Sequence, residues 1–268
     1  MKVATIQMNS GPDVTQNLGA AGTLLAQAAA GGAVLAVLPE NFAMMGARES
    51  DRLAAAEAPG TGPIQDAMAE LAQKLSLWIV AGTLPIRGRT ANRVAPASVV
   101  FDANGRQVAR YDKIHLFDVD IPGKKEIYRE SATFEPGKEP ILVETPVGML
   151  GLSVCYDMRF PELYRQLSAR GARLLAMPAA FTVPTGLAHW ELLLRARAVE
   201  NLCYVLAAAQ WGMHANGRET YGDAMIVDYW GRVLARRAAG SGVVLAEIDS
   251  AAQASVREGF PALKHRVL

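Results

Sequence analysis

Three residues with reactive side chains, Glu40, Lys113 and Cys155, each stand at or just after the end of a run that is typical of a β-strand. In α/β folds, the crevice beyond the carboxyl ends of the strands is the usual place for a functional site. A thiol, an ammonium and a carboxylate suffice to hydrolyse a carbon–nitrogen bond: the thiolate attacks the carbonyl or cyano carbon, the carboxylate takes the thiol proton, and the ammonium stabilises the oxyanion. These residues therefore indicate nucleophilic hydrolysis that requires no histidine.

The neighbours of Cys155 bear on its role. A cysteine at a strand end is more often a small buried core residue than a nucleophile. In the segment GLSVCYDMRFPE, however, the charged residues Asp157 and Arg159 follow Cys155 closely. A strand buried for packing alone is not expected to place two charges there. We therefore interpret Cys155 as a nucleophile, with the core interpretation as the alternative.

The elements that must hold these residues follow from the apolar runs and their flanking glycines and prolines. Strands are expected in the runs 3–8, 33–40, 78–83, 98–102, 106–114, 149–155, 172–177, 203–209, 223–228, 232–236 and 242–249, and helices at 14–30, 64–75, 161–170, 187–202 and 251–258. Strands and helices interleave, with hairpins among them, which predicts an α/β fold with mixed sheets. No repeat, linker or composition break marks a boundary, so residues 1–268 are expected to form a single domain.

Two segments need separate interpretation. Residues 117–140 lose periodicity and include Pro122, Gly123, Pro136 and Gly137, so we expect a long irregular segment, which is usually functional or disordered. Residues 18–38 carry no charge and are long enough to span a bilayer. Ala and Gly dominate this stretch and a Gly pair interrupts it, so a helix followed by a strand is expected instead.

Composition and charge exclude several classes of function. Lys and Arg number 27 against 26 Asp and Glu, a net charge of +1, which argues against binding to nucleic acid. Hydrophobic residues make up 51% of the chain, so a packed core is expected rather than disorder. Two cysteines, Cys155 and Cys203, are too few for a disulfide framework, and the absence of a signal peptide pattern also favours a reduced, cytoplasmic compartment. The histidines show no metal-ligand spacing and no nucleotide-binding glycine motif occurs, so neither metal nor cofactor is expected.

Five segments together resemble the nitrilase, or carbon–nitrogen hydrolase, superfamily. They are LPENF, YDKIHLFDVDIPG, VCYDMRFPE, TGLAHWELLLRARAVEN and YGDAMIVDYWG, and the similarity extends to their spacing and over nearly the whole chain. The resemblance implies a four-layer α-β-β-α sandwich and at least a homodimer. It also implies Cys155 as nucleophile, Glu40 as general base, Lys113 as the cation that stabilises the tetrahedral intermediate, and the backbone N–H of Tyr156 as a second oxyanion donor. Glu130 matches a glutamate that orients the lysine and substrate, with a solvated loop carboxylate as its alternative role.

Physical chemistry gives two expectations for this triad. A neighbouring cation lowers a thiol pKa, so Lys113 is expected to help hold Cys155 as a thiolate. Glu40 must accept a proton and return it to the leaving amine, which suits a carboxyl group whose pKa burial has raised.

Within the superfamily, the sequence is most similar to amidases that act on deaminated glutathione, and next to ω-amidases of α-ketoglutaramate. The first activity yields 2-oxoglutarate and cysteinylglycine. The same resemblance associates Arg159 with a substrate carboxylate, together with Phe181 and Thr185, and a guanidinium suits such a contact. The alternative for Arg159 is an ion pair with Asp157 that braces the turn.

Other readings of the site remain open at this stage. A Cys–His amidase would use His189, which we interpret instead as a partly buried structural residue. Nitrile hydrolysis would use the same thiolate. However, the segment after Cys155 reads YDMRFPE, whereas true nitrilases typically carry Trp-Glu there. A catalytically silent scaffold on the same fold is the non-enzymatic alternative, and the presence of all four reactive residues argues against it.

Overall fold

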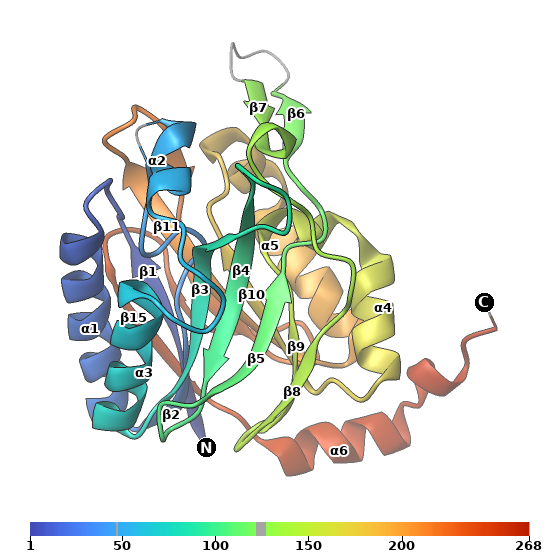
Figure 1. The fold of residues 1–268 in the computed structure, drawn as a ribbon. Helices are drawn as coiled ribbons and strands as arrows, with labels where there is room; N and C mark the ends of the chain where they lie inside the picture. Colours follow the sequence, from blue (N-terminus) through green and yellow to red (C-terminus); the bar gives the residue numbers. More distant parts are fainter. Residues whose placement is uncertain (47, 122–126, 268) are drawn as a thin grey trace.

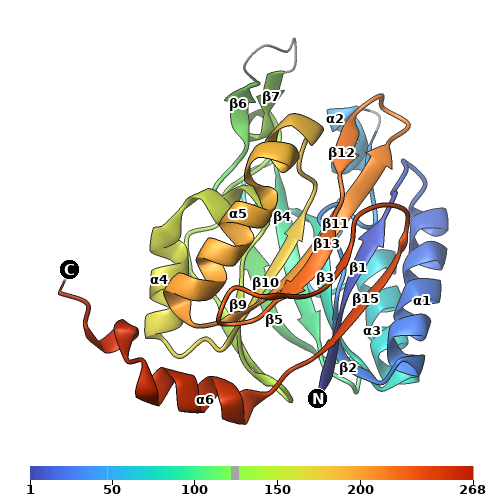
Figure 2. The same ribbon diagram turned by 180° about the vertical axis from the view of Figure 1, so that it is seen from behind.

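A computed structural model describes residues 1–46, 48–121 and 127–267, and Figures 1 and 2 show it from two sides. The helices are α1 (Val14–Ala30), α2 (Glu49–Ala54), α3 (Pro63–Leu75), α4 (Pro161–Ala169), α5 (Val183–Asn201) and α6 (Ser250–Gly259). The strands are β1 (Lys2–Met8), β2 (Ala33–Val37), β3 (Trp78–Arg87), β4 (Val94–Phe101), β5 (Gln107–Asp112), β6 (Asp118–Asp120), β7 (Ile127–Arg129), β8 (Leu142–Thr145), β9 (Gly148–Leu152), β10 (Leu174–Ala179), β11 (Tyr204–Met213), β12 (Glu219–Tyr221), β13 (Ala224–Val227), β14 (Val233–Arg237) and β15 (Gly242–Glu247).

The helices begin at residues suited to that position. Asp13 caps α1 by accepting a hydrogen bond from the backbone N–H of Gln16, and Asp249 caps α6 in the same way. Helices α3, α4 and α5 carry a proline in their first turn, where the missing N–H has no helical partner in any case. Helix α1 contains no charged residue and no residue of β2 is charged, so the uncharged stretch 18–38 is a helix followed by a strand, as predicted. In the part of the chain that the structure describes, no helix is both long and apolar enough to cross a membrane.

Hydrogen bonds join most of the described strands into one continuous sheet, in the order β5-β4-β3-β2-β1-β11-β10-β9-β8. Strand β1 is parallel to β2 on one side and to β11 on the other, but pairs with β11 only through Gln7–Ala209 and Met8–Gln210. Strand β15 runs antiparallel to β1, and β13 and β14 extend from β11. Because the junction at β1 and β11 is short, the sheet divides there into two halves.

The two halves face each other and are covered by helices on their outer sides. Helices α1 and α3 lie on one outer face and α4 and α5 on the other, with the strands between them (Figures 1 and 2). Side chains of β2 and β3, such as Leu35 and Val80, share a buried cluster with Leu152 of β9 and Leu206 of β11. The predicted four-layer α-β-β-α sandwich with mixed sheets is therefore confirmed.

Side chains of β2 and β3 alternate between two cores. Leu35 and Val37 face the other half of the sheet, whereas Ala36 packs with α1 and α3, and Ile79 and Val80 divide in the same way. Successive residues of a strand point to opposite faces, and both faces of these strands are covered. This explains why the two strands are continuous apolar runs in the sequence.

The main departures from the predicted elements are short elements that carry little periodicity. Helix α2 and strands β8 and β12 were not predicted, and β3 and α5 are longer than expected. The segment 117–140 is not wholly irregular, because β6 and β7 pair as an antiparallel hairpin. Pro122 and Gly123, which contributed to that prediction, lie outside the described residues.

Candidate active site

The strands that precede the three predicted catalytic residues all run in the same direction. Strand β2 is parallel to β3, and β5 is antiparallel to β4, which is itself antiparallel to β3. In the other half, β9, β10 and β11 are parallel to one another and β11 is parallel to β1. The carboxyl ends of β2, β5 and β9 therefore meet at one edge, where Glu40, Lys113 and Cys155 follow them.

Lys113 lies at the centre of this edge and is completely buried. Its Nζ is 2.9 Å from Oε1 of Glu40 and 2.9 Å from Oε2 of Glu130. The same Glu130 oxygen accepts a hydrogen bond from the backbone N–H of Phe117 at 2.8 Å. The side chain of Glu130 is 16% exposed, so it is a buried partner of the lysine rather than a solvated loop carboxylate. An ammonium has three N–H donors, and the two carboxylates use two of them.

The electrostatics of Lys113 and Glu40 are coupled through this contact. Burial alone would lower the pKa of Lys113, but the charges of Glu130 and Glu40 outweigh burial and raise it. Burial alone would raise the pKa of Glu40, but Lys113, a hydrogen bond with Cys155 and the charge of Arg218 together hold it below its usual value of 4.5. The expectation that burial leaves Glu40 with a raised pKa is therefore wrong, because a buried cation touches its carboxylate.

The surroundings of Cys155 favour its neutral thiol form. Burial raises the pKa of its thiol well above the usual value, and the negative charge of Glu40 adds to that rise, although Lys113 acts in the opposite direction. Lys113 thus lowers the pKa of the thiol, as expected, but burial and the charge of Glu40 outweigh this effect and leave the pKa raised. A neutral thiol hydrogen-bonded to an ionised carboxylate is an arrangement in which deprotonation can accompany attack on a substrate.

The backbone at Cys155 has a positive φ of 48°, which side-chain-bearing residues rarely adopt. The turn that imposes it is fixed by Asp157, which is fully buried. One Asp157 oxygen accepts hydrogen bonds from the N–H of Val154 at 2.8 Å and the hydroxyl of Tyr111 at 2.7 Å. The other accepts from the backbone N–H of His115 at 3.0 Å. Asp157 thus ties the cysteine turn to the segment that carries the lysine.

A second set of polar contacts fixes Glu40. The side-chain amide of Gln210 donates to the backbone carbonyl of Glu40 at 3.0 Å and to the hydroxyl of Ser10 at 2.8 Å. The N–H of Asn41, the next residue, donates to the Thr83 hydroxyl at 2.8 Å. Sequence patterns did not single out these partners, because buried glutamine, serine and threonine carry no motif signal.

A narrow pocket opens above these residues and contains every predicted substrate contact. Its lining includes the predicted residues Glu40, Glu130, Cys155, Tyr156, Arg159, Phe181 and Thr185, together with Phe117, Ala180, Thr182 and Arg218, which were not predicted. The free volume is about 10 Å³, room for roughly one water molecule. Any substrate must therefore displace lining side chains, and the longest of these are the two arginines.

Arg159 is oriented by aromatic rings rather than by a carboxylate. Its guanidinium lies 5.5 Å from the ring centroid of Phe181 and 5.8 Å from that of Tyr156. Its Nη1 is 3.3 Å from Nδ1 of His189, whose pKa is lowered by desolvation and by the arginine's charge. Asp157 has other partners, and no ion pair joins it to Arg159 among the described residues, so the brace interpretation of Arg159 is wrong.

The other cysteine and histidine side chains lie outside this arrangement. Cys203 is fully buried beneath α6, where Arg257 reaches its sulfur at 3.2 Å, which agrees with its interpretation as a core residue. His189 is partly buried, as expected, and its recorded contact is with Arg159. Among residues 1–46, 48–121 and 127–267, no three His, Cys, Asp or Glu side chains gather as a metal ion would require.

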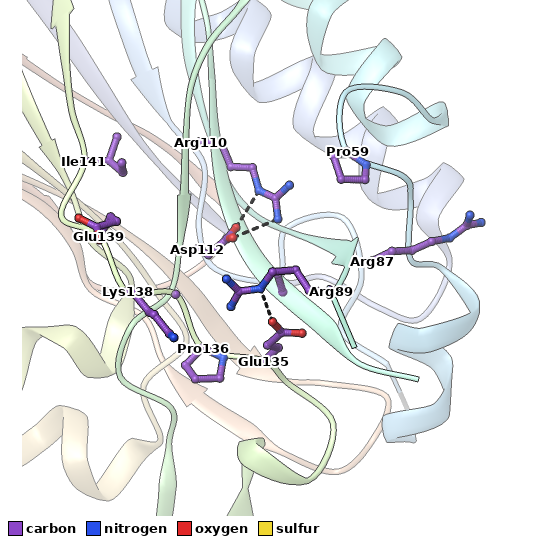
Figure 3. A pocket seen from close by; sticks show the side chains of 13 residues that line it. Pro59, Arg87, Arg89, Arg110, Asp112, Glu135, Pro136, Lys138, Glu139 and Ile141 are labelled. Carbon is purple, nitrogen blue, oxygen red and sulfur yellow. Dashed lines mark hydrogen bonds and ion pairs between the residues drawn. The ribbon is translucent and has the colours of Figure 1, made fainter. Parts of the chain in front are cut away.

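A larger cavity of about 540 Å³ lies elsewhere, between the edge strand β5 and residues 135–141 (Figure 3). Arg110 pairs with Asp112 at 2.7 Å, and Arg89 pairs with Glu135. The residues that line this cavity include no cysteine, serine, threonine or histidine. It therefore offers space but no thiol, hydroxyl or imidazole group, whereas the narrow pocket holds the thiol of Cys155.

Comparison with known proteins shows the family to which the chain is related. Residues 2–258 match the family described as Carbon-nitrogen hydrolase. A protein named deaminated glutathione amidase from Synechocystis sp. (strain PCC 6803 / GT-S) is 44% identical over 268 residues, which cover 98% of this chain and 97% of that protein.

Two solved structures share the fold over nearly the whole chain. The crystal structure of the Caenorhabditis elegans NitFhit protein has a TM-score of 0.91 and 40% identity, and covers 99% of this chain, which spans 65% of that longer protein. Saccharomyces cerevisiae Nit3, described as a member of branch 10 of the nitrilase superfamily, has a TM-score of 0.89 and 30% identity, and covers 100% of this chain and 97% of that one.

Proposed function

The chain belongs to the carbon-nitrogen hydrolase family and is an enzyme that hydrolyses amides, and we propose that its substrate is deaminated glutathione, cleaved to 2-oxoglutarate and cysteinylglycine. One observation carries the proposal furthest: the pocket above Cys155 contains a guanidinium, Arg159, with no carboxylate partner among the described residues. The 2-oxo acid end of deaminated glutathione supplies a carboxylate, which a guanidinium binds in a bidentate manner. The relatives that carry this name are 41–44% identical over almost the full chain.

In the proposed mechanism, Glu40 takes the proton of the Cys155 thiol as the sulfur attacks the amide carbon. The carbonyl oxygen becomes an oxyanion, which the third N–H of Lys113 and the backbone N–H of Tyr156 stabilise. Glu130 keeps Lys113 oriented through the contact described above. The lowered pKa of Glu40 is consistent with this role, because the carboxylate is ionised and ready to accept the proton at neutral pH.

The tetrahedral intermediate then collapses. Glu40 gives its proton to the departing nitrogen, the carbon–nitrogen bond breaks, and cysteinylglycine leaves while the 2-oxoglutaryl group stays on sulfur as a thioester. Water attacks the thioester carbon as Glu40 accepts one of its protons, and that proton returns to the sulfur when 2-oxoglutarate leaves. The carboxylate thus acts as base and acid in each half of the reaction, and no cofactor is consumed.

The test is product analysis by mass spectrometry with deaminated glutathione and α-ketoglutaramate in parallel. Cys155→Ala serves as the blank for each substrate. The proposal expects a higher kcat/KM for release of cysteinylglycine than for release of ammonia. A higher value for ammonia release would make the enzyme an ω-amidase, and no turnover of either substrate above the blank would contradict the substrate assignment.

We also propose that two copies associate through an exposed apolar patch formed by Leu192, Val199, Trp230 and Phe260. Leu192 and Val199 are seven positions apart on α5, which places them on one face of that helix, and they are 68% and 48% exposed. Trp230 and Phe260 are 50% and 53% exposed, and their ring centroids lie 5.7 Å apart. Val199 lies beside Gly231, the residue after Trp230, so the helix face and the ring pair adjoin each other. Exposed apolar side chains that gather in this way mark an interaction site. Light scattering should give the mass of a dimer for the native chain and of a monomer for Leu192→Glu.

A cytoplasmic location completes the proposal. The mechanism needs Cys155 as a free thiol, and both cysteines are free in the structure. A reducing compartment maintains thiols in that state. Fractionation of the source cells with an antibody against the chain would test this location.

A further inference from the structure

Two arginines line the pocket above Cys155, and only Arg159 was predicted to bind substrate. The second, Arg218, lies in the loop between β11 and β12. Its Nη2 donates to the backbone carbonyl of Ala180, and its guanidinium lies 5.1 Å from the ring centroid of Tyr128. Its Nε is buried and has no hydrogen-bond partner among the described residues.

The charge of Arg218 is also not neutralised by a direct ion pair. Other arginines have a carboxylate within reach: the buried Arg197 is 2.7 Å from Glu200, and the more exposed Arg236 contacts Asp223. No carboxylate lies within ion-pair distance of Arg218 in the described part of the chain. A partly buried guanidinium without a counter-charge is costly, and its unpaired buried Nε–H adds to that cost. An anionic group brought by a ligand would remove both costs.

The surroundings of Arg218 indicate which end of a substrate it meets. It lines the same pocket as Glu40 and lies over Tyr128, whose ring packs against Phe117, the residue that donates a backbone hydrogen bond to Glu130. Its charge also helps to lower the pKa of Glu40. In the proposed mechanism, Glu40 gives its proton to the departing nitrogen, so the leaving group lies on the Glu40 side of the scissile bond. Arg159, by contrast, lies against Phe181 and Tyr156. The two guanidiniums therefore address the two sides of the bond.

We propose that Arg218 binds the C-terminal carboxylate of a peptide leaving group, while Arg159 binds the carboxylate of the acyl group. The inference rests on the proposed function and deepens it. Deaminated glutathione carries a carboxylate at each end, whereas α-ketoglutaramate releases ammonia and has no charge on that side. Arg218 is therefore the residue that makes the enzyme prefer the longer substrate.

The experiment is a cycle of four kcat/KM measurements. The native enzyme and Arg218→Gln are each assayed with deaminated glutathione and with an analogue in which the glycine carboxylate is a carboxamide. A bidentate charged contact predicts a loss of about 10- to 100-fold from either change alone and little further loss from both together. The loss should lie mainly in KM, because the contact is remote from the reacting bond. If the loss for Arg218→Gln with the carboxamide analogue equalled the product of the two single losses, the inference would be overturned.

Matched controls separate a binding role from an effect through Glu40. Any change in the pKa of Glu40 affects both substrates equally and cancels in the cycle. Arg159→Gln should lose activity with deaminated glutathione and with α-ketoglutaramate. Its loss should multiply with the loss that the carboxamide analogue causes. Arg218→Lys, which keeps the charge without the planar fork, should recover part of the preference.

Equal losses of Arg218→Gln on deaminated glutathione and α-ketoglutaramate would overturn the inference and leave the proposed function intact. A native enzyme that does not release cysteinylglycine above the Cys155→Ala blank would instead overturn both.

Discussion

The cavity beside β5 and the pocket above Cys155 differ most in how their charges are balanced. In the larger cavity, Arg89 and Arg110 each have a carboxylate of the same chain within 2.7 Å (Figure 3). In the pocket, Arg159 and Arg218 have no such partner among the described residues, although the pocket has about 10 Å³ of free space against about 540 Å³. Space alone therefore does not distinguish the two regions as candidate sites; unpaired charge next to a cysteine thiol does.

The two regions also differ in how rigidly their parts are held. Lys113 and Asp157 are fully buried and each contacts two separate segments of the chain. Arg89 and Arg110 lie on the surface, with side chains 71% and 24% exposed. Preorganised buried charges act strongly because little water screens them, whereas exposed pairs contribute little. The comparison predicts large effects of substitution at one site and small effects at the other.

The largest effect is expected for Cys155→Ala, because this change removes the proposed nucleophile. Turnover should fall by about 10⁴-fold or more, with an unchanged circular dichroism spectrum. Cys203→Ala is the matched control: it removes the other buried thiol and should retain activity while the melting temperature falls by a few degrees. Substantial activity in Cys155→Ala would contradict the assignment of the nucleophile.

Lys113→Ala should lose both turnover and stability. The substitution leaves Glu40 and Glu130 as buried carboxylates without their shared cation, and breaking a buried ion pair from one side costs about 3–5 kcal/mol. Chemical denaturation at neutral pH measures this cost. The fold should persist if the native stability exceeds that loss, and the deficit should shrink at lower pH, where Glu40 can take up a proton. Activity close to that of the native enzyme would contradict the role of Lys113.

The pH profile tests the lowered pKa of Glu40. Because Glu40 must be ionised to take the thiol proton, kcat/KM should fall about tenfold per pH unit only below 4.5, its usual pKa. The same ionised carboxylate stabilises the fold above that value, and this stability is lost as the pH falls through the lower pKa of the folded state. Circular dichroism at each pH separates lost chemistry from unfolding. An acid limb centred well above 4.5 would show that Lys113 does not hold Glu40 ionised.

The smallest effect is expected for Arg110→Ala in the larger cavity. Its pair with Asp112 lies near the surface, so the free energy of unfolding should change by less than about 1 kcal/mol. The value of kcat/KM should stay within about twofold of the native enzyme. A large loss of activity would mean that this cavity takes part in function and would undo the contrast between the two regions.

Much of this molecule was predictable from local sequence. The boundaries of α1 follow from Asp13 and the glycines after it, and the apolar runs of β2, β3, β10 and β11 indicate strands buried on both faces. Short elements such as β12 and the β6–β7 hairpin were missed, because three residues are too few to show periodicity.

The residues proposed for catalysis could also be selected from the sequence. Glu40, Lys113 and Cys155 stand where strands end, and their neighbours carry motifs that resemble a known family. Arg218 carried no such signal, since a lone arginine in a loop is ordinarily a solvated surface residue.

Tertiary structure alone decided the protonation states and the partners of these residues. The pKa of Glu40 is lowered and that of Cys155 is raised because Lys113, Glu40 and Cys155 are buried together, and electrostatic effects depend on distance and desolvation rather than on order along the chain. The same reason applies to Asp157, whose nearest charged neighbour in sequence is Arg159 but whose carboxylate bonds Tyr111, Val154 and His115. The sequence determined which groups are present, and the fold determined which of them are within reach of one another.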